Sequence, residues 1–386
     1  MKAKSIKGKS TEEIQRALTE SKKDGFTPTL AIVFITKIEN AKAIQSILDA
    51  AGIAIFGAST SEKFTEEGID PDGIVVLLLD INPNHFRIVL KEYNESSPYK
   101  AARQVGTMGI NTFKNPGFII SAIDFRISGE ELINGLVNIA GQDVTVMGGV
   151  AGNPANFSGI LFTNDASSST GGVMALVIDQ DKIELSGLAV SGWKPAGTAK
   201  KITKGEGSWI YTIDDEPAMN VIQKFLGNEI VINTDAESLV PMDAGYPLQF
   251  QRVSGTPIMK PVLLWNKADQ SVMVGGHINE GDHFRFSLPP DFDVIDTVIE
   301  STRVIKEKEM PEADALIVFS CVGRLGTLGP LISAEIEGLA ATWNKPMIGF
   351  FSLGEFGKLD ESQCEFHGTT VSWVALKEKY PSTSSG

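Results

Sequence analysis

Short apolar runs alternate with amphipathic segments along most of the chain, and together they predict strands and helices in turn. Residues 29–36 and 73–80 are apolar enough for buried strands. Between them, apolar side chains at helical spacing predict a helix over Asn40–Gly52, with the asparagine as its cap and the glycine at its end. A capping-box pattern, Ser10–Glu13, predicts another short helix before the first strand.

The same order of elements recurs twice further along the chain. The predicted elements are strand 117–123, a helix opened by the capping box Ser128–Glu131, strand 144–149, then strand 315–321, helix 331–343 and strand 346–352. The second strand of each later copy leads into a glycine-rich loop, at 148–152 and at 353–357. Three copies of strand, helix, strand, loop and returning strand are therefore expected.

A β-rich stretch separates the second copy from the third. It contains expected strands at 261–264, 271–274 and 283–288, and an expected helix at 215–227. Strand–helix–strand units favour parallel crossovers, whereas the strands that return after the loops favour antiparallel neighbours. The predicted fold class is therefore α/β of a mixed α+β kind, with mixed β-sheets, strand–helix–strand units and a β-rich middle.

Composition limits the partners and the compartment. The 386 residues predict two or three domains, and 42% hydrophobic residues are enough for a large core. A net charge of −14 argues against a general nucleic-acid binder and against docking on anionic lipid. The apolar runs are too short to span a bilayer, and no apolar leader segment follows the basic start, so a cytoplasmic protein without membrane insertion is expected.

Cysteine and histidine are scarce. Two cysteines exclude a disulfide framework and fit a reducing compartment, and with four histidines they make a dense zinc site improbable. No complete nucleophile elbow or phosphate-binding P-loop is present, and the glycines at 148–152 open no helix. We therefore expect no enzyme of these common classes.

Polar residues gather where the C-terminal strands are predicted to end. If those strands are neighbours, an arginine, carboxylates, a histidine and hydroxyl groups surround one pocket, as α/β sheets usually place ligands. Such a set suits a zwitterion such as an amino acid, since arginine holds a carboxylate and glutamate an ammonium. Glycine N–H groups add anion contacts. The candidate ligand-binding residues are Ser320, Cys321, Arg324, Glu335, Ser352, Gly354, Glu355, His367, Gly148 and Gly149.

Three alternatives stay open on the sequence alone. Arg324 can instead form a structural ion pair with a nearby glutamate. Cys321 and His367 can form the centre of a thiol hydrolase, although a cysteine ending an apolar strand is more often inert packing. His277 and His283, like His367, are candidate axial ligands of a haem, provided that an apolar pocket faces the ring.

These motifs resemble the FIST (F-box and intracellular signal transduction) proteins, a sensory family with an N-terminal and a C-terminal part. The resemblance covers about residues 28–377. The stretches that carry it are Met147–Gly152, Gly192–Gly197, Ile202–Ser208, Asp215–Ala218, Phe319–Arg324 with Glu335, Gly349–Glu355 and His367–Thr370.

The resemblance implies an N-terminal part at 28–225, a C-terminal part at 226–377 and a disordered tail at 378–386. It also implies ligand sensing in bacterial signalling, with amino acids as the proposed ligands. Some FIST proteins bind haem, respond to nitric oxide and regulate a partner histidine kinase of a two-component system. Because no output segment is visible in the sequence, the expected function is a cytoplasmic sensor, not an enzyme, that acts in trans.

Overall fold

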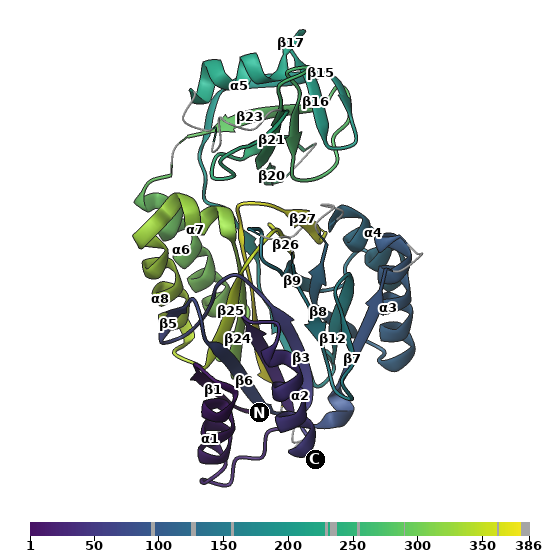
Figure 1. The fold of residues 1–386 in the computed structure, drawn as a ribbon, viewed down its shortest axis with the longest axis vertical. Helices are drawn as coiled ribbons and strands as arrows, with labels where there is room; N and C mark the ends of the chain where they lie inside the picture. Colours follow the sequence, from purple (N-terminus) through teal and green to yellow (C-terminus); the bar gives the residue numbers. More distant parts are fainter. Residues whose placement is uncertain are drawn as a thin grey trace.

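A computed structural model describes residues 1–93, 97–124, 129–155, 158–227, 231, 238–252, 255–288, 290–360 and 363–379. The chain forms a larger body, made of α/β elements, and a smaller β-rich unit above it (Figure 1). The smaller unit runs from β15 to β23 and is called the inserted unit below. The α/β class with mixed sheets and a β-rich middle is confirmed.

The body is built from three copies of one element order, as the sequence pattern predicts. The first copy contains β1 (Lys2–Gly8), α1 (Thr11–Ser21), β2 (Leu30–Ile35), α2 (Asn40–Ala50), β3 (Ala54–Ser59), β4 (Lys63–Thr65), β5 (Gly68–Asp70) and β6 (Ile74–Asp80). After the short helix η1 (Pro83–His85), the second contains β7 (Phe86–Glu92), α3 (Pro98–Thr112), β8 (Pro116–Ile123), α4 (Gly129–Ala140), β9 (Val146–Val150), β10 (Leu161–Phe162), β11 (Ser168–Ser169) and β12 (Gly172–Asp179).

The third copy is interrupted by the inserted unit. It contains β13 (Ile183–Ser186), β14 (Ala189–Val190), α6 (Phe292–Lys308), β24 (Ala315–Cys321), α7 (Val322–Leu328), η2 (Gly329–Leu331), α8 (Ile332–Trp343), β25 (Met347–Ser352), β26 (Glu355–Gly357), β27 (Glu365–His367) and β28 (Val371–Glu378). The inserted unit follows β14 and ends before α6, so the chain crosses between unit and body twice.

Each copy forms one sheet and lends a hairpin to another. The three sheets have the orders β1-β6-β2-β3-β10-β11, β7-β12-β8-β9-β26-β27 and β13-β28-β24-β25-β4-β5. In every sheet the first four strands come from one copy and the last two from a different one. The hairpin of the first copy joins the third sheet, that of the second joins the first, and that of the third joins the second, so the exchange closes on itself.

The registers of the exchanged strands are equivalent in the three sheets. Gly57 of β3 pairs with Phe162, Gly349 of β25 pairs with Phe64, and Gly148 of β9 pairs with Phe356. A Cβ on Gly57 or Gly349 would collide with the ring of its partner phenylalanine. Glycine at these positions therefore allows the exchanged hairpin to lie close to the host strand.

The inner faces of the three sheets meet in a shared apolar core. Its buried side chains come from all three copies, including Phe34, Ile119 and Phe350, and the rings of Phe34 and Phe350 lie 4.8 Å apart edge to face. The helices cover the outer faces in three separate clusters. Hydrophobic burial thus holds the copies together from inside while each sheet keeps its own helix layer.

The inserted unit has an apolar core of its own. Its strands are β15 (Pro195–Glu206), β16 (Trp209–Ile213), β17 (Glu216–Pro217), β18 (Leu239–Pro241), β19 (Leu248–Phe250), β20 (Ile258–Lys260), β21 (Val262–Asn266), β22 (Val272–Val274) and β23 (His283–Ser287), and its helix is α5 (Ala218–Leu226). All buried members of its core cluster lie between Ala196 and Phe286. The sequence boundary expected between residues 225 and 226 falls inside this unit.

Several local expectations are confirmed and others are wrong. The Ser10 side chain caps α1 by accepting the Glu13 N–H at 3.3 Å, whereas Ser128 lies outside the described residues. Asn40 is the first residue of α2, not its cap. The helix expected from Asp215 begins only at Ala218, because Asp214 and Asp215 have positive φ angles in the preceding turn. The loop expected over 353–357 contains strand β26 instead.

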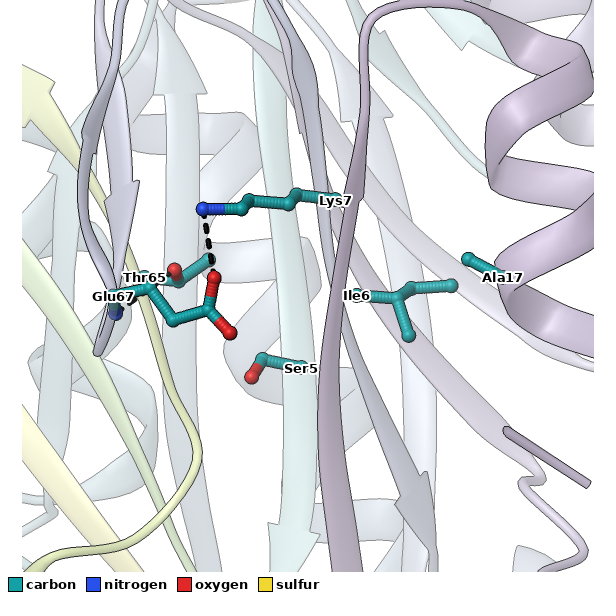
Figure 2. A pocket seen from close by; sticks show the side chains of 6 residues that line it. All are labelled: Ser5, Ile6, Lys7, Ala17, Thr65 and Glu67. Carbon is teal, nitrogen blue, oxygen red and sulfur yellow. Dashed lines mark hydrogen bonds and ion pairs between the residues drawn. The ribbon is translucent and has the colours of Figure 1, made fainter. Parts of the chain in front are cut away.

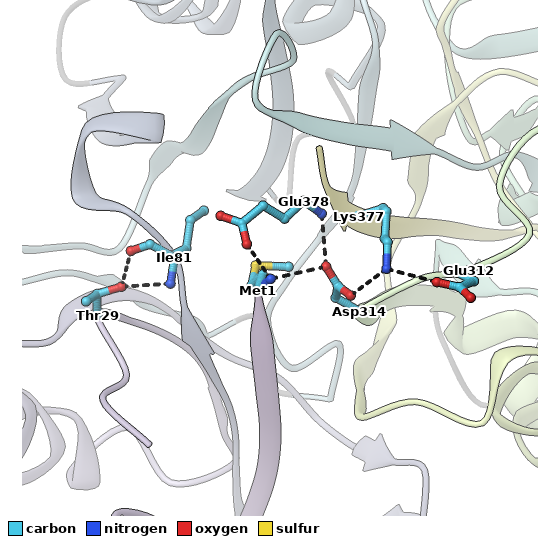
Figure 3. Close-up of polar contacts among 7 residues, drawn as sticks. All are labelled: Met1, Thr29, Ile81, Glu312, Asp314, Lys377 and Glu378. Atoms are coloured by element: carbon cyan, nitrogen blue, oxygen red, sulfur yellow. Dashed lines mark hydrogen bonds and ion pairs between the residues drawn. The ribbon is translucent and has the colours of Figure 1, made fainter. Parts of the chain in front are cut away.

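The first and last strands of the body are joined by charges (Figure 3). The N-terminal ammonium of Met1 contacts Glu378 and lies 3.6 Å from an Asp314 carboxylate oxygen, while Lys377 bridges Asp314 at 3.1 Å and Glu312 at 3.3 Å. Strand β28 reaches Glu378, so the tail expected from 378 starts in ordered strand; residues 380–386 lie outside the described chain. Within the described residues, no helix is long and apolar enough to cross a membrane.

At another corner of the body, the edge strand β1 meets the exchanged hairpin β4–β5. A pocket of about 240 Å³ lies there, lined by Ser5, Ile6, Lys7, Ala17, Thr65 and Glu67 (Figure 2). The Lys7 ammonium and the Glu67 carboxylate lie 2.7 Å apart across it. Side chains, not backbone ladders, therefore close this corner, and no candidate ligand-binding residue lines the pocket.

Candidate functional site

The carboxyl ends of β24 and β25 carry the polar residues expected from the sequence. The two strands are parallel, and Cys321 pairs in register with Ser352. Ser320, Cys321 and Ser352 are all buried. The Ser352 hydroxyl oxygen lies 3.1 Å from the Ser320 carbonyl oxygen. The structure therefore brings the motifs at 319–324 and 349–355 together where β24 and β25 of the third sheet end.

Glu355 lies at the centre of this polar cluster. It begins β26, is 0% exposed, and its carboxylate accepts from the Ser352 hydroxyl at 2.6 Å and from the Thr370 hydroxyl at 2.8 Å. The Thr370 backbone N–H adds a third bond at 3.2 Å. Burial raises the pKa of Glu355 to about 8, against the opposing effect of these hydrogen bonds. The group therefore changes charge near neutral pH.

His367 lies opposite Glu355 on the neighbouring strand β27. Its Nε2 is 3.1 Å from the Gly357 carbonyl, and burial lowers the pKa of the ring to about 4. The neutral ring thus donates from Nε2, which leaves Nδ1 as an acceptor. Among the described residues, neither this Nδ1 nor the Ser320 hydroxyl has a hydrogen-bond partner. A buried polar atom without a partner needs an explanation, and a bound polar ligand or a water molecule would supply the missing partner.

The candidate glycines lie in the backbone that supports Glu355. Gly149 of β9 pairs with Glu355, and Gly148 pairs with Phe356. A Cβ on Gly148 would collide with the Ile120 carbonyl, and one on Gly149 would come 2.9 Å from the Ser352 Cβ. Gly354 has a φ of 154°, where a side chain would meet the Phe366 ring. These glycines are needed for close backbone approach, and they hold β26 in place.

Arg324 and Glu335 hold each other, which is the structural ion pair left open as an alternative. Both side chains are 0% exposed; the Arg324 Nε lies 3.1 Å from one Glu335 carboxylate oxygen, and Nη2 contacts the other. The remaining nitrogen, Nη1, donates to the Ser191 carbonyl at 2.6 Å and the Thr369 carbonyl at 3.3 Å. No two-pronged face of the guanidinium remains among these contacts for a ligand carboxylate.

The same arginine fixes the chain segment that leads into the inserted unit. Its guanidinium carbon lies 4.8 Å from the centre of the Trp193 ring, and Ser191 directly precedes this segment's Gly192. Sequence reasoning missed Ser191 and Trp193 as partners of Arg324. The signal that could have found them is the motif Gly192–Gly197, which contains Trp193 directly after Ser191 and Gly192.

The internal repeat gives Glu355 two counterparts. The residue that precedes the paired phenylalanine is Glu355 in the third hairpin, Lys63 in the first and Leu161 in the second. Lys63 is fully buried, its ammonium contacts the Thr36 hydroxyl, and burial lowers its pKa to about 8. The three junctions are therefore alike in backbone but differ in charge, and only the acidic one lies beside a histidine.

The structure does not support a thiol hydrolase at Cys321 or a haem site at the candidate histidines. Burial raises the pKa of the Cys321 thiol, and the Glu355 carboxylate raises it further, so the thiolate a hydrolase needs is disfavoured. His277 and His283 are exposed, and His367 is enclosed with its Nε2 on a backbone carbonyl. A haem ligand needs an apolar pocket facing the ring, so these residues do not fit haem. Within the described ranges, no group of three or more metal-ligating side chains occurs.

Comparison with known families and structures completes the picture. The model of the FIST N domain matches residues 29–216, and that of the FIST C domain matches residues 218–358. Their common boundary, at Pro217, lies inside the inserted unit, at the end of β17. No curated protein matches. A crystal structure of a chorismatase aligns over 97% of this chain and 98% of its own at 9% identity, but its TM-score of 0.33 supports no conclusion.

Proposed function

Since this chain belongs to the FIST family of signal-transduction sensor domains, we propose that it binds an amino-acid-like ligand at the Glu355 cluster and signals to a separate protein. The partner class is a histidine kinase or a comparable signalling protein, and the compartment is the bacterial cytoplasm. Two buried, free cysteines, Cys321 and Cys364, support a reducing compartment.

One observation carries the choice of ligand. The Glu355 carboxylate and the His367 Nδ1 are both acceptors, both buried, and they face the same side of the paired strands β26 and β27. Two acceptors on one face favour a ligand that donates to both, and an ammonium group supplies three N–H donors and a charge opposite to that of the carboxylate. The unpartnered Ser320 hydroxyl is available for a neutral polar group beside it.

The carboxylate end of an amino acid would be bound without Arg324. That guanidinium is committed to Glu335 and to two backbone carbonyls. Among the candidate residues, the Ser320 hydroxyl is a donor left to bind the carboxylate. The proposed site therefore selects its ligand mainly by the amine.

A thermal-shift screen with free amino acids and simple amines tests this function. At least one compound is expected to raise the melting temperature of the wild type and to have little effect on Glu355→Gln or His367→Asn. His283→Asn, a change at an exposed histidine of the inserted unit, serves as the matched control and keeps the wild-type shift. Equal shifts in all four proteins, or none with any compound, would refute the proposal.

The pKa of Glu355 gives the site a defined pH dependence. An ammonium ligand needs the ionised carboxylate, and the pKa of Glu355 is about 8 in the free protein. Affinity is therefore expected to rise about tenfold per pH unit between pH 6 and 7.5 and to level off above pH 8, as one proton leaves on binding. Titration calorimetry across this range measures it. A flat profile in the wild type, or an unchanged slope in Glu355→Gln, would contradict the assignment.

A further inference from the structure

The inserted unit is held on the body without a shared apolar core. Its own core cluster contains residues between Ala196 and Phe286, and the body's clusters contain residues outside that range. It is joined to the body by two connections, one after β14 and one before α6. A unit that is internally well packed but attached through few apolar contacts is expected to move as a rigid piece when it moves.

Charged and polar contacts hold the unit in place. Glu130, at the start of α4, accepts from the Lys260 ammonium at 2.5 Å and from the His277 backbone N–H at 2.7 Å. Arg252 of the unit forms an ion pair with Glu365, and the Thr256 N–H donates to Asp360 at 2.9 Å. The body thus presents acidic groups to basic ones on the underside of the unit.

Glu130 is the centre of these contacts. The Lys260 side chain is 6% exposed and that of Glu130 is 26% exposed, so the pair is largely shielded from water. The Lys260 ammonium also contacts the His277 carbonyl, so both ends of this carboxylate–ammonium bridge engage the same loop. Removing the Glu130 carboxylate leaves the buried Lys260 ammonium without its counter-charge. The ammonium is then more stable in water, which favours a position in which the inserted unit has moved away from the body.

The closed position covers the Glu355 cluster. The Gly368 N–H donates to the Met259 carbonyl at 3.0 Å, and the Thr369 hydroxyl donates to the Ala244 carbonyl at 3.2 Å. These two body residues lie between His367 and Thr370. Beside them, a cavity of about 150 Å³ lies between α4, β20 and β27, with Glu130, Ile258 and Phe366 in its wall. The contact between the two parts is therefore incompletely packed next to the cluster.

We propose that the inserted unit is a hinged cover over the Glu355 cluster and that the Glu130–Lys260–His277 contact is the latch that holds it closed. The Arg324–Glu335 pair, which fixes Ser191 and Trp193, anchors the hinge on the body side. Opening the latch exposes the cluster, and closing it over a ligand changes the surface formed by the two parts. Opening of the cover would give the ligand of the proposed function its path to the Glu355 cluster. The opening motion itself requires no ligand.

Hydrogen exchange of the full chain without any added ligand tests the latch. In Glu130→Gln, amides at 363–372, 244–252 and 255–261 are expected to exchange at least about tenfold faster than in the wild type, because opening no longer breaks the buried pair. Amides in β16 and in β24, which lie inside the two cores, are expected to be unchanged. Glu131→Gln, the exposed neighbour on α4, is the matched control and is expected to match the wild type.

Two outcomes would overturn the latch. One is unchanged exchange at 363–372 in Glu130→Gln; the other is faster exchange spread evenly over β16 and β24, which would mean global destabilisation. Lys260→Met provides a second variant that breaks the same contact from the other side. If the latch opens as expected but no amine binds, the proposed function fails alone; if an amine binds and exchange is unchanged, the latch fails alone.

Discussion

Replacing Arg324 by methionine is expected to lower the free energy of unfolding by about 3–5 kcal/mol, since the change leaves the Glu335 carboxylate buried without its counter-charge. Both partners of the pair are 0% exposed. The same substitution removes the donors that bind the Ser191 and Thr369 carbonyls, and it frees the connection to the inserted unit. Urea unfolding of the variant and the wild type, followed by far-UV circular dichroism, measures the loss.

A double variant distinguishes the effect of the unpaired Glu335 charge from the effect of losing the arginine side chain. Arg324→Met combined with Glu335→Leu removes both charges, and most of the lost stability is expected to return. Arg303→Met is the matched control, because Arg303 and Glu300 form an exposed pair at 3.6 Å, and its loss is expected to be below about 1 kcal/mol. A loss below about 1 kcal/mol in Arg324→Met would show that the buried pair does not support the fold, and the ligand-binding alternative for Arg324 would regain its place.

Gly148→Ala is expected to destabilise the protein by about 1–3 kcal/mol, at the upper end of this range, because overpacking against fixed backbone cannot be relieved by a rotamer change. The added Cβ would collide with the Ile120 carbonyl and come 2.7 Å from the Ile120 side chain. Strand β9 would then move from β8 and from β26, which carries Glu355. Thermal unfolding followed by calorimetry measures the effect.

The control for this glycine is Gly171→Ala, where an added Cβ meets no atom within 4 Å. Its stability is expected to stay within about 0.5 kcal/mol of the wild type, as for ordinary surface changes. If Gly148 instead binds a ligand through its backbone, Gly148→Ala would keep its stability and lose only the ligand-induced shift. That result would contradict the packing role assigned to this glycine.

The repeated order of elements in the body could be predicted from sequence, because local apolar periodicity indicates each of its main strands and helices. The buried strand 30–35 and the first five residues of strand 315–321 are uninterrupted apolar runs, and the Ser10 cap is a local signal. The hairpin exchange could not be predicted. The strands β4, β10 and β26 have two or three residues each, and their partners are set by tertiary packing instead of local pattern.

The candidate site was predicted in part. The motifs at 319–324 and 349–355 are indeed neighbours, because they end parallel strands that pair in register. Which carboxylate Arg324 meets could not be read from spacing, since Glu335 and Glu355 are both within reach of a strand end. The cover over the cluster was missed for a similar reason: Glu130 and Lys260 are 130 residues apart, and the capping-box pattern around Glu130 indicates a helix start, not a contact with a distant lysine.

The cyclic exchange of hairpins has a consequence for synthesis on the ribosome. Strand β9 leaves the exit tunnel long before β26 and β27, the strands that complete its sheet. Until the third copy emerges, the nascent chain presents a bare, glycine-rich edge that no earlier segment can cover. Co-translational folding can therefore close the first sheet early, through β10 and β11, but the second stays open until β26 and β27 have emerged, and its unpaired edge is exposed to aggregation during that interval.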